Sequence, residues 1–149
     1  VQIGREAKNP ILTTGRAIYG LLAKMQVYQF HDTTDTSRIR GSVNKTDGKY
    51  LKSDGGNTAA VLYAVKNIPE YQSYYNKIVN YVRRGMPDFQ DFEVTGSPEN
   101  TSEIFLTWRI AGVDVVFSPN QLSDGTINFI ALATLLVAPE RVIPYIMSR

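Results

Sequence analysis

The sequence predicts an α+β fold in which helices pack on a small antiparallel sheet. Apolar residues recur with helical spacing in two segments, Thr58 to Asn67 and Pro69 to Arg84. Apolar and polar residues alternate from Glu103 to Ile110, ahead of an Ala-Gly pair, which predicts a β-hairpin. A chain of 149 residues with 43% apolar content suits a single domain, residues 1–149, with a buried core.

Composition narrows the function classes. A net charge of +2 is too small to indicate nucleic-acid binding by itself. The absence of cysteine excludes disulfides and thiolate metal sites and fits a cytoplasmic protein, and with one histidine we expect no protein-only metal site. The longest apolar run, Phe129 to Ala138, is too short to span a bilayer, and the chain starts without a signal-peptide pattern, so we expect no membrane partner.

The N-terminal part is predicted to contain a helix, a short strand and a polar loop. Pro10 to Met25 has an apolar face at helical spacing, and Gln26 to Phe30 alternates like a short strand. His31 and Asp32 open the loop that follows and could act as an acid–base pair. Because the loop is rich in side-chain acceptors, capping of turns by these residues is the simpler interpretation.

Two helices are predicted to follow a basic, polar segment. Arg38 to Ser53 is expected to form a loop or a weak hairpin. Asn57 is a suitable N-cap for the helix from Thr58 to Asn67, and the alternative for the Asp54-Gly55-Gly56-Asn57 segment is a second, backbone-rich contact to nucleotide or to a partner subunit. In the helix from Pro69 to Arg84, a stripe of tyrosine and aliphatic residues favours core packing over the stacking of nucleic-acid bases.

The β part is predicted further along the chain. Phe89 to Phe92 is expected to be a loop that leads to strands. The strand from Glu103 to Ile110 places its apolar residues on one face, and Val113 to Phe117 returns as its partner. Arg109 and Asp114 are placed to form an exposed ion pair across this hairpin.

A polar turn then leads into a strongly apolar helix, Ile127 to Leu136. The first turn of a helix has unpaired N–H groups and partial positive charge. Gly125 allows a ligand to approach closely, and Ser123 and Thr126 add hydroxyl groups, so this turn is suited to hold a phosphate. The structural alternative is that Ser123 simply caps a buried helix.

The amino-acid sequence of this turn and its helix resembles the signature motif of ABC-type ATPases, and more closely that of the RecF/SMC-like predicted ATPases of the AAA-type group. The residues that carry the resemblance are Leu122-Ser123-Asp124-Gly125-Thr126 and the helix that follows. Other segments resemble parts of that family in the same order: Val27 to Thr34, Leu51 to Leu62, Pro87 to Phe92 and Ile104 to Trp108. The resemblance covers residues 26–140 approximately. It implies a truncated ATPase-family domain, namely the signature lobe with neighbouring pieces of the sheet.

Two motifs that this family needs for hydrolysis are missing from the sequence. There is no Gly-x-x-x-x-Gly-Lys-Ser/Thr loop for the phosphates and Mg²⁺, and no apolar strand ending in Asp-Glu follows Glu140. We therefore expect no catalytic residue and no ATP hydrolysis by the chain alone. The resemblance implies that Ser123, Asp124, Gly125 and Thr126 contact the γ-phosphate of ATP held by another subunit, with Asp124 turned away from the phosphate or capping the helix.

Partners and cofactors follow from the same resemblance. ATP and Mg²⁺ would bind only together with a complete partner, either a full-length ATPase subunit or a homo-oligomer. One alternative is a non-catalytic interaction protein that kept part of the fold and self-associates through uncovered apolar residues, Ile130, Leu135 and Leu136. A weaker alternative is a nucleic-acid-binding accessory protein, which would show a strongly salt-dependent affinity.

Overall fold

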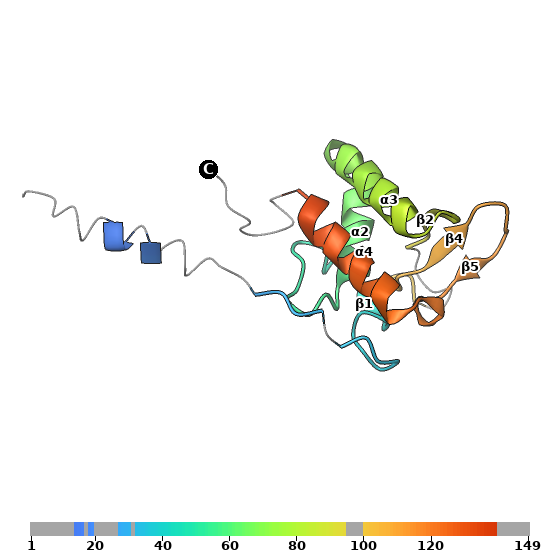
Figure 1. Cartoon of the computed structure of the whole chain (residues 1–149), viewed down its shortest axis with the longest axis horizontal. Helices are drawn as coiled ribbons and strands as arrows, with labels where there is room; N and C mark the ends of the chain where they lie inside the picture. Colours follow the sequence, from blue (N-terminus) through green and yellow to red (C-terminus); the bar gives the residue numbers. More distant parts are fainter. Residues whose placement is uncertain (1–13, 17, 20–26, 31, 95–99, 140–149) are drawn as a thin grey trace, which may run out of the picture.

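The computed structural model describes residues 14–16, 18–19, 27–30, 32–94 and 100–139, and it confirms the α+β fold (Figure 1). The main helices are α2 (Thr58–Asn67), α3 (Gln72–Gly85) and α4 (Asp124–Val137). Short strands and turns connect them: β1 (Val43–Asn44), η1 (Pro69–Tyr71), β2 (Phe89–Phe92), β3 (Glu103–Ile104), β4 (Trp108–Ile110), β5 (Val116–Phe117) and η2 (Pro119–Gln121).

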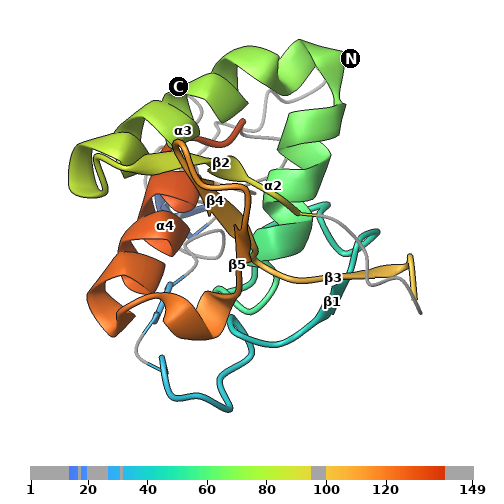
Figure 2. The same cartoon turned by 90° about the vertical axis from the view of Figure 1, so that its right-hand side faces the viewer.

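The three helices form one layer, in which α3 packs against both α2 and α4. A three-stranded antiparallel sheet of order β2-β4-β5 lies against this layer, and β1 and β3 pair separately as a two-stranded sheet (Figure 2). The core is built from helix residues and from sheet aromatics: Phe92 and Ile130 are fully buried, and Phe89 is almost so. Its apolar surface supplies the main driving force for folding.

Helix α2 has the predicted bounds, but the side chain predicted to cap it does not do so. Asn57 occupies the N-cap position, yet its side chain makes no capping bond to the helix. Its amide instead donates to the backbone carbonyls of Asp47 and Tyr50, both at 2.7 Å, and its Oδ1 accepts from Lys52 N at 2.8 Å. The side chain, which is fully buried, therefore folds the preceding loop onto the helix.

In helix α3 only some residues of the predicted tyrosine and aliphatic stripe pack into the core. It begins at Gln72, after the short turn η1, and buries Tyr75, Ile78, Val79 and Val82. Tyr74 and Tyr81 stay 36% and 47% exposed. The helix is thus amphipathic, with apolar residues facing α2, α4 and β2 and an aromatic and basic row facing outward.

The prediction of a loop from Phe89 to Phe92 is wrong, because these residues form strand β2. A shift of register between Phe89 and Asp91 lets both phenylalanines face the core, although they are three residues apart. Their rings lie 4.7 Å apart between centroids, and Trp108 stacks on Phe89 at 6.3 Å. This aromatic cluster joins the sheet to the helix layer.

The segment from Arg38 to Ser53 does not form a hairpin with itself. Within it, Val43 and Asn44 pair with Ile104 and Glu103 as strands β1 and β3. The strand predicted from Glu103 to Ile110 is therefore divided between two sheets, with β3 in one and β4 in the other. Its apolar residues still share a buried face, since Ile104, Leu106 and Trp108 are at most 5% exposed.

The hairpin of β4 and β5 confirms the prediction from the Ala-Gly turn, although its second strand is shorter than expected. Trp108 pairs with Phe117 and Arg109 with Val116. Gly112 adopts φ +78°, a left-handed conformation that favours glycine. The predicted pair of Arg109 and Asp114 forms at 3.2 Å, and Arg109 also contacts Glu93 at 3.1 Å.

The predicted N-terminal helix and the predicted strand after it have different outcomes. Most of the predicted helix from Pro10 to Met25 lies outside the described residues, while residues 14–16 and 18–19 are helical. The strand predicted from Gln26 to Phe30 is wrong for its described part, residues 27–30, which has no regular structure. There Gln29 N donates to Ser53 O at 2.8 Å, a single bond that does not extend into a ladder within the described residues.

Helix α4 buries more of its apolar residues than we expected for a truncated domain. Ile130 is fully buried and Leu135 is 7% exposed, so the expectation that they are uncovered is wrong. Leu136 is 66% exposed, as expected, and Phe129 and Leu132 are partly exposed. Phe129 packs over Gly85, where an added Cβ would lie 3.1 Å from its ring.

A buried tyrosine gives the fold a testable dependence on pH. Tyr75 donates to Asp91 Oδ1 at 2.7 Å, and burial, followed by this hydrogen bond, raises the pKa of Tyr75 far above its ordinary value. In the unfolded chain Tyr75 loses its proton near pH 10, whereas the folded protein keeps it, so this contribution to stability is lost as pH rises above about 10. We expect Tyr75→Phe to lower the free energy of unfolding by about 1 kcal/mol at pH 7. We also expect its loss of stability above pH 10 to be shallower than that of the wild type.

Urea denaturation at a series of pH values measures this difference. Tyr81→Phe is the matched control because Tyr81 is 47% exposed, and it should keep the wild-type slope. A Tyr75→Phe protein that loses stability as steeply as the wild type above pH 10 would contradict the assignment.

Candidate functional site

The turn singled out by the sequence is delivered by η2. Gln121 N donates to Ser118 O at 3.1 Å, and Ser118 N donates to the side-chain Oε1 of Gln121 at 2.7 Å. These reciprocal bonds close the turn before Leu122, which is buried and anchors it to the core. Ser123 is therefore presented at a fixed place, directly before α4.

Ser123 is the N-cap of α4, as the structural alternative predicted. Its Oγ accepts a hydrogen bond from Thr126 N at 3.2 Å and lies 2.8 Å from the Thr126 hydroxyl. Capping does not remove the site from solvent, because Ser123, Asp124 and Gly125 are exposed and Thr126 is partly exposed. The four residues that the sequence analysis predicted to form the site, Ser123 to Thr126, thus lie together at the surface.

The first turn of α4 keeps two amides available. Thr126 N is bonded to Ser123 Oγ, and Ile127 N donates to Ser123 O at 3.0 Å. Within the part of the chain that the structure describes, no acceptor is found for the backbone N–H groups of Asp124 and Gly125. Unpaired amides at the positive end of a helix are donors suited to an anion.

Gly125 is open on its side-chain face. An added Cβ would have no heavy atom within 4 Å. The glycines ahead of α2 differ: at Gly55 an added Cβ would lie 2.9 Å from the ring of Phe30, and at Gly56 it would lie 2.8 Å from Arg38 Cβ. Gly55 and Gly56 are thus explained by packing, whereas Gly125 is not.

The Asn57 side chain is not available for a ligand, and the alternative of a second, backbone-rich contact from residues 54–57 stays a prediction. Asn57 is fully buried, and both its carbonyl oxygen and its amide are occupied by the loop from Asp47 to Lys52. We therefore assign Asn57 a structural role.

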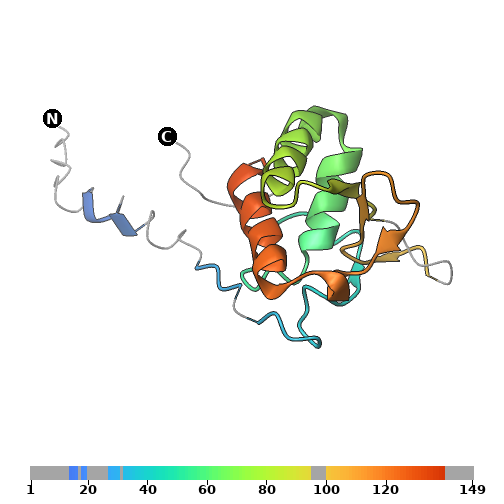
Figure 3. The same cartoon turned by 45° about the vertical axis from the view of Figure 1, so that its right-hand side comes forward.

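Arg40 is a residue of this site that the sequence analysis missed. Its guanidinium is buried and contacts the turn three times, at Pro119 O (2.5 Å), Leu122 O (3.2 Å) and Asp124 Oδ1 (2.8 Å). Its Nε also donates to Thr33 O at 2.8 Å. In Figure 3 the loop that contains Thr33 and Arg40 runs beside the start of α4.

The Arg40 contact explains the position of Asp124. The carboxylate accepts from Arg40 at 2.8 Å and remains 70% exposed. Its expected orientation away from a bound phosphate stays a prediction. A first-turn carboxylate also interacts favourably with the helix dipole. No sequence pattern identified Arg40, since one arginine in a basic, polar loop has no periodicity that marks it as buried.

The polar loop around Asp32 behaves as the simpler interpretation predicted. Asp32 Oδ1 accepts from Thr34 N at 3.2 Å and from its hydroxyl at 2.7 Å, an Asx-type turn on the surface. His31 lies outside the described residues, so the acid–base alternative stays a prediction.

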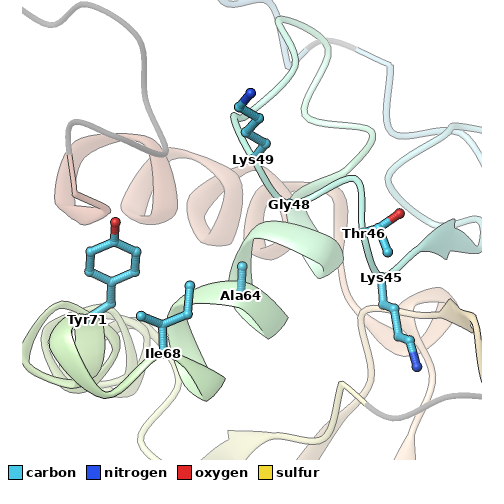
Figure 4. Close-up of a pocket in the computed structure, with 7 residues that line it drawn as sticks. All are labelled: Lys45, Thr46, Gly48, Lys49, Ala64, Ile68 and Tyr71. Carbon is cyan, nitrogen blue, oxygen red and sulfur yellow. The ribbon is translucent and has the colours of Figure 1, made fainter.

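Two surface hollows do not include the turn. One, of about 270 Å³, has Ala64, Ile68 and Tyr71 along one side and Lys45 and Lys49 near its edges (Figure 4). The two ammonium groups extend in different directions, so this hollow lacks the converging polar groups typical of a ligand site. The other hollow is polar and lies beside the loop of residues 36–44.

Among the described residues, no group of three or more His, Cys, Asp or Glu side chains is placed to hold a metal ion. No helix in that part of the chain has the length and apolar character needed to cross a membrane. Comparisons with protein-family models, with curated proteins and with solved structures found no match.

The buried guanidinium generates a stability prediction. Arg40→Met would leave the carbonyl oxygens of Pro119 and Leu122 without their donor, and we expect it to lower the free energy of unfolding by about 3 kcal/mol. Asp124→Asn keeps an acceptor at an exposed position and should lower it by about 1 kcal/mol at most. Urea denaturation followed by the fluorescence of the single tryptophan, Trp108, measures both. Equal losses in the two variants would contradict the assigned role of Arg40.

Proposed function

We propose that the chain is an incomplete ABC/SMC-like ATPase module whose Ser123 turn contacts the γ-phosphate of ATP bound to a partner subunit. The observation that supports this most directly is the first turn of α4, where exposed hydroxyl groups adjoin two unpaired amides. A phosphate oxygen is the kind of acceptor that such donors bind. The resemblance of the turn and its helix to the ATPase signature motif is the reason to propose that this phosphate is that of ATP.

The proposed roles follow from the geometry of each residue. Ser123 donates its hydroxyl, and the amides of Asp124 and Gly125 donate to the phosphate oxygens. The open face of Gly125 gives the partner's nucleotide room to approach. Arg40 balances the charge of Asp124 and keeps its carboxylate at the side of the turn.

ATP and Mg²⁺ enter this proposal only with a complete partner. The amides and hydroxyls of the turn fit a phosphate, whereas the P-loop and the acidic strand that hold ATP and Mg²⁺ would be the partner's. The partner would be a full-length ATPase subunit or an oligomer that contains one, in the cytoplasm. The chain has no role in water activation in this scheme.

Complementation of a defective ATPase tests the proposal. The partner is a full-length ATPase of the resembling family that carries arginine in place of its own signature serine. We expect Mg-ATP turnover to rise as this chain is added, because Ser123 completes the closed site. Ser123→Arg should reduce that rescue by at least about tenfold, by analogy with loss of a single charge-stabilising donor.

Two further variants make the test specific. Ser73→Arg adds the same charge at an exposed position of α3 and should keep the rescue. Gly125→Ala should weaken the rescue while leaving the free energy of unfolding unchanged or slightly higher, since alanine is the better helix former. The proposal fails if the wild type gives no rescue or if Ser123→Arg rescues equally well. A stable oligomer with no response to Mg-ATP would then favour the non-catalytic interaction protein.

The outer face of α3 favours a second candidate, contact with single-stranded nucleic acid. Lys77 Nζ lies 5.9 Å from the ring centroid of Tyr74, and Arg84 Cζ lies 5.5 Å from that of Tyr81. These four residues follow helical spacing along the exposed face, and α3 contains no acidic residue. Exposed aromatic rings alternating with cations suit stacked bases and phosphates.

Binding of fluorescent oligo-dT, followed by anisotropy at several salt concentrations, tests this candidate. We expect affinity to fall with salt and the slope of log K against log salt to decrease by about 0.7 for Lys77→Gln and likewise for Arg84→Gln. Tyr81→Ala should weaken binding by about tenfold, the loss of one stacked base. Lys45→Gln, a change outside α3, is the control for charge. Absence of binding at low salt, or an equal effect of Lys45→Gln, would exclude this face as a nucleic-acid site.

A further inference from the structure

A polar hollow of about 490 Å³ lies between the loop of residues 36–44 and the segment that precedes α2. Its size is in the range of small-molecule sites, roughly 300–1,000 Å³. Functional groups along it come from Ser37, Arg38, Ser42, Asn44, Asp47 and Lys52. None of the residues of the Ser123 turn lines it.

Ser37 is the unusual member of this lining. It is only 3% exposed, and its hydroxyl has no hydrogen-bond partner within the part of the chain that the structure describes. Its backbone is fixed on both sides, because Ser37 N donates to Thr34 O at 2.9 Å and Ser37 O accepts from Arg40 N at 3.1 Å. A buried hydroxyl without a partner is unfavourable, so an acceptor that reached Ser37 Oγ from the hollow would form a hydrogen bond that the protein leaves unmade.

The neighbouring side chains also have more donors than acceptors. Arg38 donates to Asp54 at 3.3 Å, and its guanidinium has further N–H groups. Lys52 is bonded to Asp47 and likewise has further donors. Asn44 uses its Oδ1 to accept from Thr46 N and Oγ1, at 3.0 and 2.7 Å, and its amide group makes no hydrogen bond among the described residues.

The lining carries two positive charges and one negative charge, although each cation is paired with one carboxylate. Arg38 and Lys52 are positive and Asp47 is the single carboxylate among the lining residues, where it is already paired with Lys52. Asp54 pairs with Arg38 but does not line the hollow. An arginine, a lysine and neutral donors around one space are the groups that recognise phosphate oxygens.

We propose that this hollow binds a phosphoryl group, that of inorganic phosphate or of a small phosphorylated metabolite, at a site separate from the Ser123 turn. Ser37, Arg38, Lys52 and Asn44 would supply the donors. The volume exceeds that of a phosphate ion, which leaves room for a small organic group attached to it.

Titration with inorganic phosphate, followed by amide chemical shifts and balanced with chloride at constant ionic strength, tests the site. We expect saturable shifts at Ser37, Arg38 and Asn44. Ser37→Ala and Arg38→Gln should each weaken binding, Arg38→Gln by at least about tenfold because a charged hydrogen-bonding group is lost. Lys77→Gln removes one positive charge on α3 and should leave the affinity unchanged.

A second titration with ribose 5-phosphate distinguishes the two sources of the phosphoryl group. Tighter binding than that of phosphate identifies a metabolite, and equal or weaker binding identifies phosphate itself. Shifts that do not saturate, or that persist unchanged in Arg38→Gln, would overturn the site. Ser123→Arg should retain the response; if it abolishes the response, phosphate binds at the turn instead and this proposal fails. Failure of the ATPase complementation with an intact phosphate response would refute only the function proposed above.

Discussion

The burial of one guanidinium holds together two segments that are far apart in the sequence, the loop around Arg40 and the turn before α4. Arg40 has a side chain that is 4% exposed, and a buried charge is tolerated only where its donors find acceptors in good geometry. Here the acceptors come from both ends of the described chain: Thr33 on one side, and the Pro119 and Leu122 carbonyls with Asp124 on the other. The loop and the turn must therefore meet, although Arg40 and Asp124 are 84 residues apart.

The start of α4 depends on this meeting point. With the turn held by Arg40 and by buried Leu122, the helix directs Ile127 and Ile130 into the core and leaves its first turn in solvent. In this geometry the protein contacts of the turn are made by two neighbouring side chains. Ser123 caps the helix and Asp124 satisfies Arg40, so the amides of Asp124 and Gly125 are the groups left without a protein partner.

Elements governed by local patterns could be predicted from the sequence, and elements governed by distant contacts could not. The periodicity of α2 and α3 and the glycine turn after β4 are local, and the structure confirms them. Strand β2 was missed because its irregular register buries Phe89 and Phe92 at a spacing of three residues, which no strand alternation produces. Arg40 was missed because its partners lie far away along the chain.

The candidate turn was found from its residue types, and the structure adds a distinction that the sequence could not make among the glycines. At Gly55 and Gly56 a side chain would collide with Phe30 or Arg38, so the fold itself accounts for them. At Gly125 no atom of the protein is close to where a side chain would be. A glycine in a helix interior is less favourable than alanine by about 1 kcal/mol, but Gly125 lies in the first turn of α4, where that loss does not apply in full. Open space alone does not mark a site, since Gly15 is open in the same way; at Gly125 it is compatible with the proposed approach of a partner's nucleotide.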